Sequence, residues 1–151
     1  MYQLVDKSSG QFIYAATVIR YVESPHHRPH QRLDSILGLH PPFKDLPFVE
    51  LDALYTHILK ITDDPQLFVD ILIFPAMYYT NTSVGQVERI HALESGDVEV
   101  LLSDVASVVQ IRTQDSNIKL LHKSFFDFLL DPHRSKEFFR NPMDTTRRFY
   151  P

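Results

Sequence analysis

The sequence has no cysteine, few glycines and no long uninterrupted apolar run. The absence of cysteine excludes disulfide scaffolds, thiolate metal sites and cysteine nucleophiles, and it fits an intracellular protein best. The longest apolar run, residues 71–79, is interrupted by Pro75 and falls short of the roughly 18 residues that a membrane-spanning helix needs. The first ten residues, MYQLVDKSSG, lack the basic start and apolar centre of a signal peptide. We therefore expect a soluble, cytoplasmic chain with no membrane partner.

Signatures of catalysis are missing as well. The chain contains no GxxxxGKS/T phosphate loop, no GxSxG elbow, no HExxH motif and no glycine-rich dinucleotide turn. Its net charge of −4, with scattered basic residues, disfavours nucleic acid as a partner, because such binding depends on clustered cations that neutralise phosphates. The hydrophobic fraction of 44% and the charged fraction of 23% are typical of globular proteins. We expect a folded chain that is not an enzyme.

The first part of the chain has helical periodicity. Apolar residues occupy nearly every face of residues 11–22, which predicts a helix that is covered on both sides. Two prolines then break the pattern, and Pro29 can open a second helix that ends near residue 37. A third, amphipathic helix is expected over residues 48–63. We assign residues 1–64 to a helical layer.

The second part has the element order of a winged-helix domain. Asp64 and Pro65 supply the cap and the first turn of one helix, which Pro75 should kink or end. Ser83 and Gln86 have capping-box spacing ahead of a second, short helix, and a third helix follows. Alternating apolar and polar residues on either side of TQDSN then predict a β-hairpin before a last helix.

We therefore expect a mainly α fold, with a winged-helix-like domain and one small β-hairpin at residues 65–140 and a tail at residues 141–151. A winged helix invites a DNA-binding interpretation, which requires basic or amide side chains on its third helix. That helix, in SGDVEVLLSDVASV, carries Asp97, Glu99 and Asp104 without any lysine or arginine. Phosphate repulsion therefore opposes docking on DNA.

Three histidines, His26, His27 and His30, lie close together between the first two predicted helices. Three imidazoles can bind zinc where a loop folds around the ion. Two prolines stiffen this segment and no thiolate accompanies it, so an exposed linker is the favoured interpretation. We expect no metal site.

The segment LLHKSFFDFLLD, residues 120–131, places His122 and Ser124 before a block of apolar side chains. Ser124 and Asp127 have capping-box spacing, which predicts that the last helix begins at Ser124 and leaves His122 just outside its N-terminus. Free backbone N–H groups and the positive end of the helix dipole gather there. An imidazole beside them can help to hold an anion, and the geometry suits a pyrophosphate.

A plainer interpretation of His122 stays open. The residue can end the strand and hydrogen bond a nearby carbonyl group, while the aromatic residues that follow fill the core. Spacing alone favours this plainer interpretation. The aromatic residues belong to the core in either case.

Four segments, in this order, carry a family resemblance: GQFIYAATVIRYV, LPFVELDALYTHIL, SGDVEVLLSDVASVV and LLHKSFFDFLLD. They resemble the region that follows the NACHT nucleotide-binding domain in fungal NOD-like STAND ATPases, and the resemblance covers nearly the whole chain. The last segment is also similar to a motif in the winged-helix domain of animal NACHT receptors: a hydrophobic residue, His, any residue, Ser or Thr, then Phe.

The resemblance implies a role that spacing alone does not favour. In that family the winged-helix histidine contacts the phosphates of ADP and helps to lock the resting state, and exchange for ATP permits oligomerisation. By resemblance this role falls on His122, with Ser124 shaping the start of the helix. The family's phosphate loop and magnesium-binding acidic motif are not in the sequence given, so ADP or ATP is expected as a cofactor only in a full-length NACHT protein. The expected partner is an upstream nucleotide-binding domain in cis.

The expected function is thus that of a nucleotide-state-sensing lid in a signal-transducing NACHT ATPase. A stand-alone helical interaction module and a non-functional gene fragment are the alternatives, and a winged-helix DNA binder is less favoured. Alone, the chain should neither hydrolyse ATP nor bind ADP measurably, because one interaction of a few kcal/mol does not offset the entropy of association.

Overall fold

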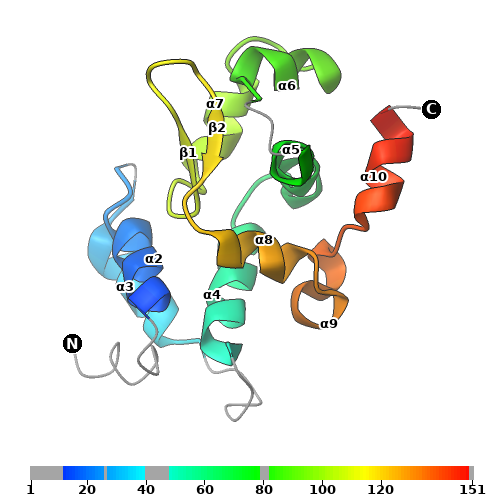
Figure 1. Cartoon of the computed structure of the whole chain (residues 1–151). Helices are drawn as coiled ribbons and strands as arrows, with labels where there is room; N and C mark the ends of the chain where they lie inside the picture. Colours follow the sequence, from blue (N-terminus) through cyan, green and yellow to red (C-terminus); the bar gives the residue numbers. More distant parts are fainter. Residues whose placement is uncertain (1–11, 26, 40–47, 79–81, 150–151) are drawn as a thin grey trace.

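The computed structural model describes residues 12–25, 27–39, 48–78 and 82–149, and it is mainly helical with one small antiparallel hairpin, as expected (Figure 1). In chain order the elements are α2 (Phe12–Val22), α3 (Pro29–Leu37), α4 (Val49–Lys60), α5 (Pro65–Tyr78), α6 (Val84–Ile90), α7 (Asp97–Ser103), β1 (Val109–Ile111), β2 (Ile118–Leu120), α8 (Lys123–Leu129), α9 (Pro132–Ser135), the 3-10 helix η1 (Lys136–Phe138) and α10 (Pro142–Phe149). Three helices, a hairpin and a further helix thus follow one another from residue 65.

Two local signals fix the helix starts as predicted. The Asp64 carboxylate accepts a hydrogen bond from the Leu67 N–H at 2.9 Å, which caps α5. At α6, the Ser83 N–H donates to Gln86 Oε1 at 2.9 Å and the Gln86 N–H donates to Ser83 Oγ at 3.4 Å, which completes the predicted capping box. Further along, α5 continues through Pro75, so this proline does not end the helix.

The hairpin is short and one of its edges is covered. Val109 pairs with Leu120 and Ile111 pairs with Ile118 across the two strands. On the outer edge of β2, the Ile118 N–H donates to the Thr82 carbonyl at 3.0 Å. The register directs the main-chain groups of Ile111 away from β2, toward the outer edge of β1.

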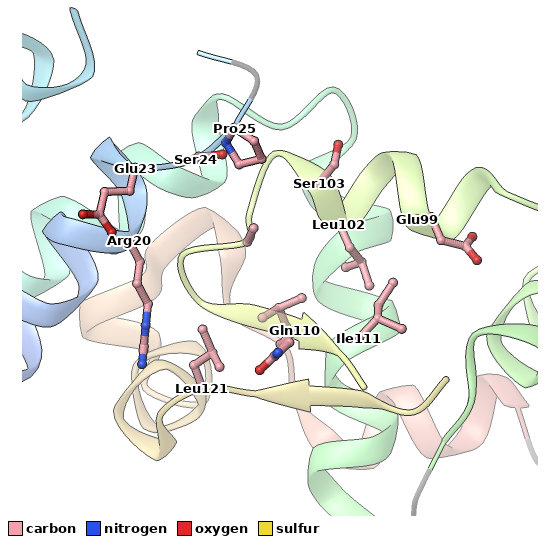
Figure 2. Close-up of a pocket in the computed structure, with 12 residues that line it drawn as sticks. Arg20, Glu23, Ser24, Pro25, Glu99, Leu102, Ser103, Gln110, Ile111 and Leu121 are labelled. Atoms are coloured by element: carbon pink, nitrogen blue, oxygen red, sulfur yellow. The ribbon is translucent and has the colours of Figure 1, made fainter. Parts of the chain in front are cut away.

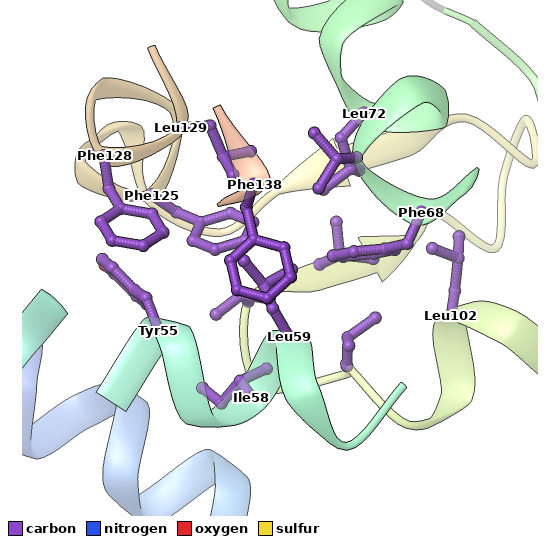
Figure 3. Packing of buried hydrophobic residues seen from close by; sticks show 14 of the residues in the cluster. Tyr55, Ile58, Leu59, Phe68, Leu72, Leu102, Phe125, Phe128, Leu129 and Phe138 are labelled. Carbon is purple, nitrogen blue, oxygen red and sulfur yellow. The ribbon is translucent and has the colours of Figure 1, made fainter. Parts of the chain in front are cut away.

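One hydrophobic core spans the expected boundary at residue 64. Side chains from α4, α5, α8 and η1 meet in it, as Figure 3 shows. The ring of Tyr55 on α4 packs against Phe125 and Phe128 on α8, with centroid distances of 4.9 and 5.4 Å. The segment expected as a tail contains α10, which packs beside α5. The helical layer and the winged-helix-like part therefore share their interior.

Helix α2 buries only one of its faces. Tyr14, Val18 and Tyr21 are buried, whereas Phe12 is 86% exposed and Ile19 is 51% exposed. The prediction that this helix is covered on both sides is therefore wrong for the described chain, because the apolar residues of the opposite face have no layer above them. In the described ranges, no helix is both long enough and apolar enough to cross a membrane.

Candidate functional site

Helix α8 begins at Lys123, one residue earlier than predicted, and His122 is its N-cap. The His122 backbone is extended, with φ −149° and ψ 137°, and its Nδ1 atom accepts a hydrogen bond from the Ser124 N–H at 3.1 Å. The predicted capping box of Ser124 and Asp127 is wrong, because the imidazole nitrogen takes the place of the capping hydroxyl. Asp127 instead lies 3.9 Å from the Lys123 ammonium group.

This cap determines which nitrogen of the His122 ring carries a proton. A backbone N–H group can only donate, so Nδ1 must present its lone pair to Ser124. A neutral imidazole with an unprotonated Nδ1 carries its proton on Nε2. Within the described residues Nε2 has no hydrogen-bond partner, and the residue is exposed. The ring therefore offers one N–H donor toward the outside.

Ser124 connects this ring to the helical layer. Its Oγ atom lies 2.8 Å from His122 Nδ1 and 2.6 Å from the hydroxyl group of Tyr55 on α4. Tyr55 is 1% exposed, and burial raises the pKa of its hydroxyl, whereas its side-chain hydrogen bonds with Ser124 and Thr17 act in the opposite direction. The predicted site residues His122 and Ser124 are thus brought together, and Tyr55 joins them from a position 69 residues away.

A narrow crevice borders the ring. Thr17, Tyr55, Ser107, His122 and Phe125 are among its lining residues, and it has no space for a water molecule. Among the described residues, the buried Ser107 hydroxyl has no hydrogen-bond partner. Polar groups therefore line a crevice beside His122 that is too narrow for a water molecule.

The helix dipole contributes less here than the sequence suggests. Helix α8 has seven residues, and the His122 ring already satisfies the Ser124 N–H. One backbone donor that was expected to face an anion is therefore occupied. The donors that remain for an anion include the Nε2–H group of His122 and the nearby Arg20, an exposed side chain that lines the same crevice.

A second hollow was not foreseen from the sequence. A groove of about 510 Å³ lies between the end of α2, helix α7 and the outer edge of β1, and Figure 2 shows Arg20, Ser24, Glu99, Gln110 and Ile111 around it. The buried Ser24 hydroxyl lines it and has no hydrogen-bond partner in the part of the chain that the structure describes. No sequence signal indicates this groove, because it arises only where distant elements meet.

The other sequence candidates do not assemble into a site. His26 lies outside the described residues, and His27 Nε2 lies 3.8 Å from an oxygen of Asp104. In the part of the chain that is described, no group of three or more His, Asp or Glu side chains is placed to hold a metal ion. On α7, Asp97 accepts a hydrogen bond from the Glu94 N–H at 2.9 Å, so this acidic residue serves the helix start.

Comparisons with protein-family models, with curated proteins and with solved structures find no match for this chain. They assign it to no family. A role for His122 and Ser124 therefore depends on the geometry of the site and on the resemblance of the four sequence segments.

Proposed function

We propose that the chain is a cytoplasmic regulatory segment of a NACHT-type signal-transducing ATPase and acts as its nucleotide-state-sensing lid. His122 donates from Nε2 to a phosphate oxygen of ADP that an upstream nucleotide-binding domain holds in cis. The observation that carries this proposal is the Ser124 N–H bond to Nδ1, which leaves an outward Nε2–H donor on an exposed ring. Phosphate oxygens accept hydrogen bonds, so the donor and the ligand are complementary.

The size of the interaction suits a sensor and not a binding site. A hydrogen bond to a charged group contributes about 1.5–3 kcal/mol, which shifts an equilibrium between two states by roughly one to two powers of ten. It is too small to offset the loss of translational and rotational freedom when ADP binds from solution. Under this proposal the chain alone does not bind or hydrolyse the nucleotide measurably, and its cofactor is held mainly by the partner domain.

The test uses the protein in which this segment follows a NACHT domain in one polypeptide. His122→Ala should speed the release of bound ADP about 10- to 100-fold, which follows from the loss of one charge-assisted hydrogen bond. The measurement is the dissociation rate of a fluorescent ADP analogue. His133→Ala removes another exposed histidine, on α9, and should leave the rate unchanged. Equal rates in the wild type and His122→Ala would contradict the sensing role.

The genomic context gives an independent test. A reading frame that continues upstream of the Met1 codon and encodes a phosphate loop is expected under this proposal. An upstream region without such a frame would remove the partner in cis. The chain would then have to be considered as a free module or a gene fragment.

A second candidate function, a protein-interaction module, is favoured by one observation. The outer edge of β1 carries main-chain groups of Ile111 that point away from β2, and the groove of 510 Å³ lies beside them. An extended peptide can add a strand to such an edge. Under this function, a peptide selected from a library should protect the Ile111 amide from hydrogen exchange, and Ile111→Pro should abolish its binding. Selected peptides that bind without protecting this amide would reject the second candidate.

A further inference from the structure

The hydrogen bonds between Tyr55, Ser124 and His122 have one direction. Nδ1 of His122 accepts a hydrogen bond from the Ser124 N–H, so this nitrogen carries no proton and cannot donate. In its 2.8 Å contact with the Ser124 hydroxyl, Nδ1 is therefore the acceptor and the hydroxyl is the donor. The Ser124 proton is then used, so at 2.6 Å the Tyr55 hydroxyl donates to Ser124 Oγ. The Tyr55 hydroxyl on α4 therefore donates to Ser124, and the Ser124 hydroxyl donates to the His122 ring at the start of α8.

We propose that Tyr55 is a positioning residue for His122, and that its hydroxyl, acting through the Ser124 side chain, adds to the backbone cap in holding the proton of the ring on Nε2. This inference rests on the proposed function, because the proton on Nε2 is the group that would meet the phosphate. Tyr55 itself touches no ligand. Its role is to keep His122 in the form that can donate.

The reversed arrangement is unfavourable at the Ser124 N–H. A proton on Nδ1 would face this N–H group, which would lose its acceptor. The Tyr55 hydroxyl would then accept from Ser124 and turn its own proton toward Thr17, the other side chain that hydrogen bonds it. A ring in that form presents a lone pair at Nε2 and repels a phosphate oxygen.

The surroundings hold the Tyr55 hydroxyl in place. The ring of Tyr55 lies against Phe125 and Phe128, with centroids 4.9 and 5.4 Å away, and Figure 3 shows it reaching from α4 toward them. The crevice lined by Tyr55 and His122 has no space for a water molecule, so in the wild-type chain no water lies between these groups there. The aromatic contacts persist in Tyr55→Phe, which makes this variant selective for the hydrogen bond.

The test measures the tautomer of His122 in the chain itself, without nucleotide. Histidine labelled with ¹⁵N gives separate long-range proton correlations for the two tautomers at about pH 8.5, above the ordinary titration range of histidine. The wild type should show His122 with its proton on Nε2. Tyr55→Phe and Ser124→Ala should each raise the Nδ1–H population about fivefold or more, which corresponds to one lost hydrogen bond. Ser124→Thr retains the hydroxyl and should restore the wild-type spectrum.

Tyr14→Phe is the matched control, because Tyr14 is equally buried at 1% exposure and lines neither hollow. It should leave the His122 tautomer unchanged. An unchanged tautomer in both Tyr55→Phe and Ser124→Ala, with the other histidine signals in place, would overturn the positioning role and leave the contact between His122 and phosphate untouched. A wild-type ring with its proton on Nδ1 would also overturn it. A changed tautomer combined with unaltered ADP release in His122→Ala would support the positioning role and reject the proposed function.

Discussion

The guanidinium group of Arg134 on α9 forms a salt bridge with the carboxylate of Asp52 on α4 through two of its nitrogen atoms. Its Nε atom lies 3.1 Å from both carboxylate oxygens, and its Nη2 atom lies 2.7 Å from one of them. Both side chains are about one-fifth exposed, at 22% and 18%. This salt bridge connects α9, in the C-terminal part of the chain, to α4 in the helical layer. It lies beside the core that contains Tyr55 and α8.

The geometry of this pair predicts a stability effect. Arg134→Lys keeps the charge but loses the fork of donors, so the free energy of unfolding should fall by about 1.5–3 kcal/mol. The measurement is urea denaturation followed by circular dichroism. Lys60→Ala breaks the ion pair with Glu137, in which both side chains are 61% exposed, and should cost about 0–1 kcal/mol. Equal losses in the two variants would contradict the special role of the fork.

The contrast between near and distant partners explains what the sequence could predict. The capping box of Ser83 and Gln86 joins residues three positions apart, so its spacing is visible in the sequence. The Arg134 pair with Asp52 spans 82 positions, and the Tyr55 contact with Ser124 spans 69. No local pattern encodes such contacts, because the packing of α4 against α8 and α9 creates them.

The candidate site shows the same limit at closer range. Spacing drew attention to His122 and Ser124 and correctly placed a helix beside them. It assigned the cap to Ser124, since hydroxyl and carboxylate side chains are the usual N-caps. The extended backbone at residue 122 allows the imidazole of His122 to cap the helix. The Ser124 hydroxyl, which was expected to be the cap, instead forms a hydrogen bond with the Tyr55 hydroxyl. The start of the helix therefore depends on a local cap by an imidazole, and the tertiary contact engages the hydroxyl that the spacing had assigned to the cap.

Burial of Tyr14 predicts a loss of stability in alkali. Burial, with a smaller contribution from Glu50, raises the pKa of Tyr14 from 10.0 to about 12. The unfolded chain therefore releases this proton at lower pH than the folded chain, so the stabilisation is complete below pH 10 and is lost as the pH rises toward 12. Tyr14→Phe should flatten the decline of the unfolding free energy across that window. An identical slope in the variant would contradict the assignment to Tyr14.

The half-buried position of His57 leads us to expect a loss of stability in mild acid, the opposite pH trend to that of Tyr14. The hydroxyl of Tyr21 lies 3.0 Å from Nε2 of His57, and burial, followed by the charge of Arg32, lowers the pKa of His57 below its ordinary value of 6.5. The unfolded chain binds this proton more readily, so the stabilisation is present above pH 6.5 and is lost as the pH falls through the lower folded value.

The measurement for His57 is the urea concentration at the midpoint of unfolding, determined at several pH values between about 8 and 5. This pH range includes the ordinary histidine pKa near 6.5. His57→Gln should reduce the drop of the midpoint in acid. His133→Gln replaces an exposed histidine and controls for the loss of an imidazole elsewhere. A variant His57→Gln that retains the full acid drop would assign the effect to other groups.

The exposed face of α2 makes the last prediction, and it bears on the proposed upstream domain. Phe12 is 86% exposed and Ile19, seven positions later on the same helix face, is 51% exposed. Apolar side chains placed together on a surface favour association with another surface. If an upstream domain covers this face, the isolated chain should bind a hydrophobic dye, and the double variant Phe12→Ser, Ile19→Ser should bind severalfold less without losing stability. Val100→Ser changes a single apolar side chain on α7 that is 70% exposed and should have little effect on the dye. Strong dye binding that persists in the double variant would show that another surface is responsible, and it would contradict the assignment of this face of α2 to the proposed upstream domain.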